Sequence, residues 1–155
     1  RQMCIRDSNR VVRCTPAGWE VEPDQRHADM LVQDLELKTA NGVTTPGEHE
    51  ARGKEEENDV ELSPGEATMY RSIAARANYL AADRPDIMYA VKELCRGMAK
   101  PTRGHWLKLK RLGRYLIESG RTVLKYVWQG HEHEVTGYFD SDWAGCRVTR
   151  KSTSG

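Results

Sequence analysis

Two carboxylates near the end of the chain have a spacing that could hold a divalent metal ion. Asp140 and Asp142 stand two residues apart, directly after the apolar pair Tyr138 and Phe139. Because side chains alternate along a strand, both carboxylates would point to the same face, and oxygen ligands are those that Mg²⁺ and Ca²⁺ prefer. The alternative is that Asp140 only caps the turn after a strand.

Rival metal sites in the same region are weaker. The string D-S-D-W-A-G opens like an EF-hand loop, but the fifth loop position is Ala144 and the twelfth, where a bidentate Glu belongs, is Lys151. The string H-E-H at 131–133 is more often a solvated polar turn than a metal site. Neither rival therefore displaces Asp140 as the leading candidate.

A basic helix is the second candidate for chemistry. At about 100° per residue, one side of the helix carries apolar residues and the adjoining sector carries Lys108, Lys110, Arg111 and Arg114. Such a cationic face can follow a phosphate backbone without reading the base sequence. The alternative is a solubilising charged face. Trp106 could stack on bases, as could Tyr115, but core packing is the stronger expectation for Trp106.

Composition narrows the classes of protein. The 155 residues have a net charge of +1, but residues 20–63 hold 13 acidic against 4 basic residues, and residues 92–125 hold 10 basic against 2 acidic. A hydrophobic fraction of 38% with a mean hydropathy of −0.74 indicates one modest core beside solvated length. No membrane-spanning or secretory pattern occurs. The four cysteines form no C-x-x-C pair, which argues against a zinc knuckle or disulfide framework and favours a reducing setting.

The N-terminal half is expected to form a hairpin and a helix. Apolar strands flank the turn T-P-A-G at 15–18, and a helix starts at the N-cap residue Asp24 and stops before Gly42. Residues 43–62 are polar, acidic and interrupted by Pro and Gly, which predicts a disordered linker. Such a linker would leave the N-terminal helix loosely attached.

The second half is predicted to be three helices and two strands. The string S-P-G-E at 63–66 is a capping box, and its helix buries a stripe comprising Tyr70, Ile73, Ala74, Ala77 and Ala81. Breaks at Arg84-Pro85 and Lys100-Pro101 separate the next two helices, and the last, basic helix ends at Gly120. Strands at 123–128 and 135–140 would then pair through a turn. The fold class is therefore α+β.

Four strings together resemble one family. They are Y-R-S-I-A-A-R-A-N-Y-L-A-A-D-R-P-D-I-M-Y-A-V at 70–91, H-W-L-K-L-K-R-L-G-R-Y-L at 105–116, G-Y-F-D-S-D-W-A-G at 137–145 and R-K-S-T-S-G at 150–155. Their order and spacing are similar to the copia-type LTR retrotransposon Pol polyprotein, where its reverse transcriptase ends and its ribonuclease H begins. V-T-T-P-G at 43–47 looks like the V-x-T-P-x segment of that family.

The resemblance implies a division of the chain. Residues 9–42 correspond to the end of the reverse transcriptase palm region and residues 63–120 to the helical thumb or connection, on either side of the acidic disordered linker that the composition of residues 43–62 predicts. Residues 121–155 correspond to a connection strand and the incomplete N-terminal start of an RNase H-like fold. The string M-C-I-R-D-S within residues 1–8 looks like a translated sequencing adapter.

The resemblance also implies function. Asp140 matches the first carboxylate of the two-metal RNase H site, and is thus the candidate catalytic and Mg²⁺-binding residue of the complete parent enzyme. The basic residues of 108–114 would contact an RNA/DNA hybrid or primer-template duplex. The rest of the Pol polyprotein is a further expected partner, and no membrane partner is expected. The parent protein would be intracellular, in a cytoplasmic virus-like particle or in the nucleus.

The fragment alone is expected to be inactive. The polymerase aspartates of a Y-x-D-D turn would lie before residue 1, and only the first RNase H carboxylate is present. Binding to a nucleic-acid backbone is the most that the fragment would retain. The alternative function is a non-enzymatic basic helical module that binds nucleic acid or an acidic partner.

Overall fold

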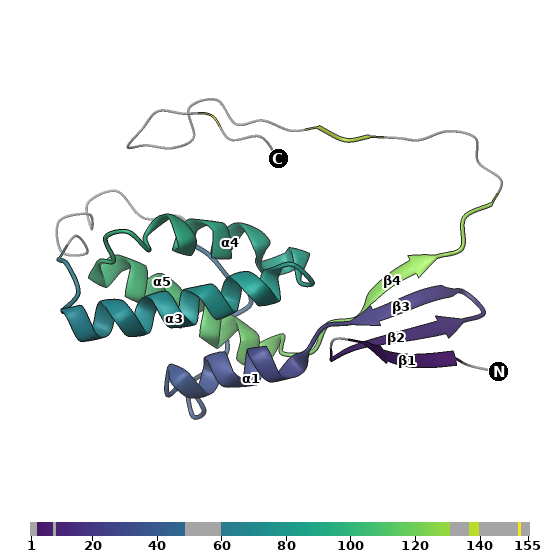
Figure 1. Cartoon of the computed structure of the whole chain (residues 1–155), viewed down its shortest axis with the longest axis horizontal. Helices are drawn as coiled ribbons and strands as arrows, with labels where there is room; N and C mark the ends of the chain where they lie inside the picture. The colour runs from purple at the N-terminus through teal and green to yellow at the C-terminus, as the bar shows by residue number, and fades with distance from the viewer. Residues whose placement is uncertain (1–2, 8, 49–59, 131–136, 140–151, 153–155) are drawn as a thin grey trace.

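The computed structural model describes residues 3–7, 9–48, 60–130, 137–139 and 152. Within this part of the chain, a four-stranded antiparallel sheet stands beside four helices (Figure 1). The strands, in sheet order, are β1 (Met3–Asp7), β2 (Arg10–Thr15), β3 (Gly18–Glu22) and β4 (Leu124–Val127). The helices are α1 (Gln25–Asp34), α3 (Pro64–Ala81), α4 (Pro85–Arg96) and α5 (Arg103–Glu118). The fold is mixed α and β, as predicted.

Side-chain caps fix the starts of α1 and α3. The carboxylate of Asp24 accepts a hydrogen bond from the backbone N–H of Arg26 at 3.1 Å, so it caps α1. Ser63 and Glu66 form the predicted capping box of α3, and Pro64 occupies its first turn. These caps satisfy backbone N–H groups that have no partner inside the helix, which is why both starts could be predicted locally.

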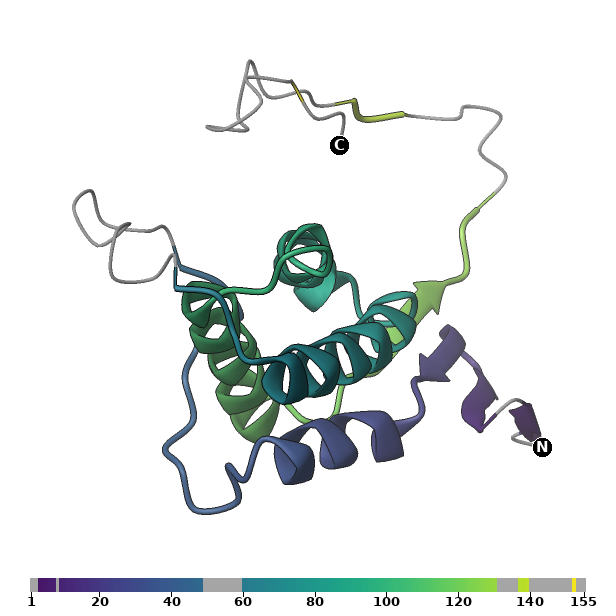
Figure 2. The same cartoon turned by 60° about the vertical axis from the view of Figure 1, so that its left-hand side comes forward.

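The core lies among the four helices, which surround it in Figure 2. The predicted stripe of α3 is buried: Tyr70, Ile73, Ala74, Ala77 and Ala81. Helix α1 adds Ala28, Leu31 and Leu35 to the same cluster and packs against α3 and α5. The expectation of a loosely attached N-terminal helix is therefore wrong, because α1 buries its apolar face against these helices.

The strand after α5 does not make the predicted hairpin pairing. β4 pairs antiparallel with β3, with Trp19 opposite Tyr126. Residues 137–139 have no strand structure, and the rest of the predicted strand 135–140 lies outside the described residues. The short connection after α5 delivers the chain to the free edge of β3, where the indole rings of Trp19 and Trp128 meet edge to face at 6.3 Å.

Gly18 permits this close pairing of β3 and β4. Its φ of +149° is one that residues with a side chain rarely adopt. A Cβ atom at this position would lie 2.0 Å from the carbonyl oxygen of Tyr126. The turn glycine is thus required both by its backbone conformation and by the neighbouring strand.

The flanks of the predicted linker make specific contacts. Residues 49–59 lie outside the described residues, but residues 43–48 lie against α5. On the other flank, Glu61 forms an isolated antiparallel β-bridge with Thr102 through the backbone. The Leu62 backbone N–H donates to the carbonyl of Pro101 at 3.0 Å. Composition did not reveal these bonds, because the partners are far away in sequence.

Glu22, at the end of β3, joins three segments. Its carboxylate accepts from the guanidinium of Arg121 at 2.8 Å and lies 3.0 Å from that of Arg13 on β2. Hydrogen bonding from Arg121, supported by Arg13, lowers the pKa of Glu22 to about 2. The chain leaving α5 is therefore tied to the sheet by a carboxylate that stays charged in moderate acid.

We expect acid to weaken the fold through Glu22. Its pKa is near 4.5 without these partners, so its stabilising contribution is fully present above about pH 5 and is lost as the pH falls towards 2. Glu22→Gln should lower the free energy of unfolding at pH 7 and flatten its decline between pH 5 and pH 2. Urea denaturation at a series of pH values measures both effects.

The control is Glu36→Gln, because Glu36 is exposed and makes no ion pair with the residues that the structure describes. This variant should keep the wild-type pH dependence. Equal slopes for the Glu22 and Glu36 variants would contradict the assignment of the acid sensitivity to Glu22.

Candidate nucleic-acid interface

Helix α5 carries all four predicted backbone-binding cations. It begins at Thr102, whose hydroxyl lies 2.8 Å from Nδ1 of His105 and whose backbone N–H donates to the same nitrogen at 3.2 Å. This is a capping box in which His replaces the usual Glu or Gln. The sequence signature misses the box for that reason.

One face of α5 is buried, and this burial fixes the direction in which the other faces of the helix point. Its buried residues are Gly104, Leu109, Leu112, Gly113 and Leu116. A Cβ atom on Gly113 would lie 2.7 Å from Leu37 and 2.8 Å from Leu35. The glycine therefore allows the segment after α1 to approach α5 closely.

Arg111 is bound to the segment 41–48, which we call the strap. Its Nη1 donates to the carboxylate of Glu48 at 2.9 Å, and its Nη2 donates to the hydroxyl of Thr45 at 2.8 Å. The Arg111 side chain is 28% exposed. Its Nε is buried and has no hydrogen-bond partner in the described part of the chain, so this nitrogen of the guanidinium is unused.

Arg114 holds the other end of the strap. Its Nε donates to the backbone carbonyl of Asn41 at 2.7 Å, and its own carbonyl accepts from the backbone N–H of Val43 at 3.3 Å. Lys110 is exposed and Lys108 is half-buried. The predicted cationic sector thus exists, but its two arginines already have partners in the strap.

The predicted metal site lies outside the residues that the structure describes. Asp140 and its neighbour Asp142 lie outside the described residues, as does the H-E-H string at 131–133. Among the residues that the structure does describe, no three His, Cys, Asp or Glu side chains come together to hold a metal ion. Cys14 and Cys95 are free thiols.

The position of α5 depends on Arg84, which is 1% exposed. Its guanidinium donates to the carbonyls of Ser119 and Gly120 at 2.8 and 3.0 Å, just beyond the end of α5. It also forms a two-pronged pair with Asp86, at 2.7 and 2.8 Å. Asp86 in turn accepts from the hydroxyl of Tyr115 at 2.9 Å, so one network joins the start of α4 to the last turn of α5.

Sequence reasoning missed this role of Arg84. The string R-P-D contributed to the family resemblance, but an arginine before a helix-initiating proline carries no general signal of burial. The two aromatic residues of α5 are also structural: Trp106 and Tyr115 both pack against the core. The expectation of core packing for Trp106 is thus confirmed.

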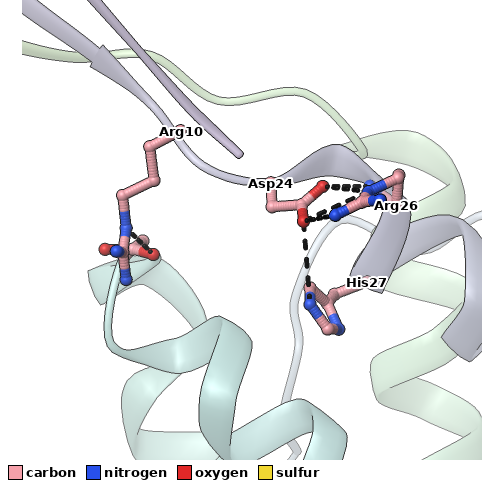
Figure 3. A network of polar contacts seen from close by, with 5 residues as sticks. Arg10, Asp24, Arg26 and His27 are labelled. Carbon is pink, nitrogen blue, oxygen red and sulfur yellow. Dashed lines mark hydrogen bonds and ion pairs between the residues drawn. The ribbon is translucent and has the colours of Figure 1, made fainter. Parts of the chain in front are cut away.

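A second polar network joins the sheet to the helices (Figure 3). Asp24 is buried, and hydrogen bonding from Arg26 lowers its pKa from the ordinary value although burial opposes the change. Nε2 of His27 lies 3.7 Å from the same carboxylate. Arg10 on β2 pairs with Asp83, just after α3, at 2.7 Å. The Asp24 contacts fix the start of α1, and the pair of Arg10 and Asp83 ties β2 to the end of α3.

Loss of the Arg84 guanidinium should destabilise the fold. We expect Arg84→Met, which keeps the length of the side chain, to lower the free energy of unfolding by about 2–4 kcal/mol, because two part-buried carbonyls and Asp86 lose their partner. Urea denaturation measures this change. Arg96→Met is the control, since the ion pair of Arg96 with Glu93 is exposed, and it should cost less than about 1 kcal/mol. Similar losses in both variants would contradict the special role of Arg84.

Comparison with known proteins identifies the relatives of this chain. It is 33% identical over 144 residues to the retrovirus-related Pol polyprotein from transposon RE1 of Arabidopsis thaliana, and 39% identical over 144 residues to that from transposon RE2 of the same plant. Its homologues are retrovirus-related Pol polyproteins from transposons. The predicted resemblance to a Pol polyprotein is confirmed. Each match covers 90% of this chain and 9% of the Pol polyprotein.

A shorter relative shares part of the sequence. An uncharacterized mitochondrial protein of Arabidopsis thaliana, AtMg00810, is 42% identical over 86 residues, which is 56% of this chain and 35% of that protein. The chain therefore spans about a third of the mitochondrial protein and about a tenth of the Pol polyproteins. No family model and no solved structure matches it. None of the described helices is long and apolar enough to cross a membrane.

Proposed function

We propose that this chain is the part of a copia-type Pol polyprotein that joins reverse transcriptase to RNase H, and that α5 binds the backbone of an RNA/DNA hybrid or primer-template duplex. Residues 9–42 would be the end of the palm region and residues 63–120 the thumb or connection. The cationic sector of α5 supports this proposal best: Lys108, Lys110, Arg111 and Arg114.

The geometry of α5 fits a phosphate backbone. Arg114 lies six positions after Lys108, which at a rise of about 1.5 Å per residue spans roughly 9 Å of helix. Phosphates on one strand advance about 3.4 Å each along a duplex, so these cations match a short run of phosphates. Cations bind phosphates irrespective of the bases, as a clamp on a moving duplex requires.

The sheet supports a refined boundary for the RNase H-like part. β4 pairs with β3 and Glu22 holds Arg121, so residues 121–130 belong physically to the same body as the N-terminal hairpin. Within the segment 121–155, the start of the RNase H-like fold would then follow residue 130. The described residues up to 130 are thus best interpreted as the last part of the polymerase.

Binding to a hybrid should be sensitive to salt. For about four phosphate contacts, affinity should fall on the order of a hundredfold between 50 and 200 mM salt. The double variant Lys108→Gln/Lys110→Gln should bind more weakly and reduce the slope of log affinity against log salt by about 2. Fluorescence anisotropy with a labelled RNA/DNA hybrid measures both quantities.

The matched control is Lys38→Gln/Lys125→Gln, which removes the same charge from exposed lysines outside α5. It should leave the slope within about half a unit of wild type. Affinity that does not change with salt, or equal effects of the two double variants, would refute the α5 interface.

Asp140 is proposed as the first carboxylate of the RNase H site in the complete Pol polyprotein. Two Mg²⁺ ions supply the activated water and stabilise the leaving oxygen in such phosphodiester cleavage. Because Asp140 lies outside the described residues, its contribution is proposed from the D-S-D-W-A-G string alone.

In the complete Pol polyprotein, Asp140→Asn should abolish RNA cleavage and leave DNA synthesis largely unchanged, because only the RNase H site loses a ligand. A hybrid substrate labelled on the RNA, with primer extension run in parallel, measures both activities. Asp29→Asn on the exposed face of α1 is the control and should affect neither. Retained cleavage in Asp140→Asn would remove the assignment.

One observation favours a second candidate function. Arg111 already holds a carboxylate, that of Glu48, so the cationic sector also accepts acidic protein groups. In this alternative the chain is a non-enzymatic module for an acidic partner. Competition between polyglutamate and the hybrid separates the two functions, since a backbone-binding helix should prefer the hybrid by about tenfold or more.

A further inference from the structure

We propose that the strap, residues 41–48, is a latch that a nucleic-acid backbone must displace from Arg111 before α5 binds with its full charge. The proposal rests on the proposed function, because it concerns the regulation of the same interface. Glu48 and Thr45 occupy the Arg111 donors that a phosphodiester would otherwise use. The strap would thus lower the affinity of the resting protein for phosphate.

The chemistry of the Arg111 contacts makes this exchange possible. A carboxylate and a phosphodiester both present oxygen acceptors to a guanidinium, and both prefer two parallel N–H donors. In the structure, Glu48 uses only Nη1, Thr45 uses Nη2, and Nε remains buried without a partner. The strap therefore leaves the Nε donor unsatisfied, and a two-oxygen anion would engage it once the neighbouring chain moved.

The Glu48 contact is weak enough to be exchanged. The side chain of Glu48 is 69% exposed, and exposed ion pairs are screened by water and salt. The guanidinium of Arg111, by contrast, is largely enclosed and pre-positioned on a helix that is packed against the core. Displacement of Glu48 would thus release the strap from Arg111. The Arg111 guanidinium would stay in place and exchange the carboxylate for a phosphate.

Arg114 makes the second set of contacts with the strap, and one of these contacts can report whether the strap is bound to α5. Its Nε holds the carbonyl of Asn41, and its carbonyl accepts from the backbone N–H of Val43. If the strap leaves α5, this Val43 amide loses its acceptor and exchanges with solvent more quickly. Hydrogen exchange at Val43 therefore reports the latch directly, independently of any change in affinity.

The first test compares two single substitutions in the full chain. Glu48→Gln should lower the Kd for an RNA/DNA hybrid by about two- to fivefold at 50 mM salt, because Arg111 loses its competing carboxylate. Glu61→Gln is the matched control: Glu61 is 61% exposed and pairs with Lys100, so the same charge is removed away from Arg111. Equal effects of the two variants would show a simple net-charge effect and overturn the latch.

Arg111→Gln provides the internal check. In that background, Glu48→Gln should change the Kd by less than about 1.5-fold, because the two residues act on one contact. An undiminished effect of Glu48→Gln without Arg111 would also overturn the proposal. So would weaker binding by the Glu48 variant, since it would mean that the strap assists binding.

The second test follows Val43 and does not require nucleic-acid affinity. Addition of pyrophosphate should increase the hydrogen-exchange rate of the Val43 amide about threefold or more in the wild type, and should have no further effect in Arg111→Gln. An unchanged rate in the wild type would overturn the latch. If pyrophosphate releases the strap but no hybrid binds, the proposed function fails while the anion-sensitive latch stands.

Discussion

A guanidinium is costly to remove from water unless its nitrogens find acceptors, and each of the three nitrogens of Arg84 donates to an acceptor inside this protein. It pairs with Asp86 at the start of α4 and donates hydrogen bonds to the two backbone carbonyls that follow α5. The end of α5 therefore cannot shift without exposing an unpaired charge in the interior. Because α5 carries the cationic sector, the geometry of the candidate interface depends on this one buried side chain.

The cationic sector is bounded by intramolecular partners. Arg111 and Arg114 donate hydrogen bonds to the strap, while Lys110 stays exposed. Gly113 allows the chain before the strap to approach α5 closely. The charge that a ligand would meet at the surface is thus smaller than a helical wheel suggests, since protein groups already satisfy part of it.

Local features of this fold could be predicted from the sequence, and distant ones could not. The cap at Asp24, the capping box at Ser63 and the buried stripe of α3 follow from neighbouring residues, and all are present. The pairing of β4 with β3 joins strands about a hundred residues apart, so turn chemistry alone could not predict it. The basic residues of α5 could be found by periodicity, but their strap contacts depend on tertiary structure. Asp140 stays a prediction from the family resemblance.

The contacts between residues 9–48 and residues 60–130 have a consequence for how the molecule holds together. Strand β3 pairs with β4, α1 packs on α3 and α5, and ion pairs join Arg76 to Asp34 and Arg10 to Asp83. Each stretch leaves an apolar face uncovered without the other. The two stretches are therefore complementary halves of one body, and a backbone nick between them would leave two peptides that remain associated without a covalent link.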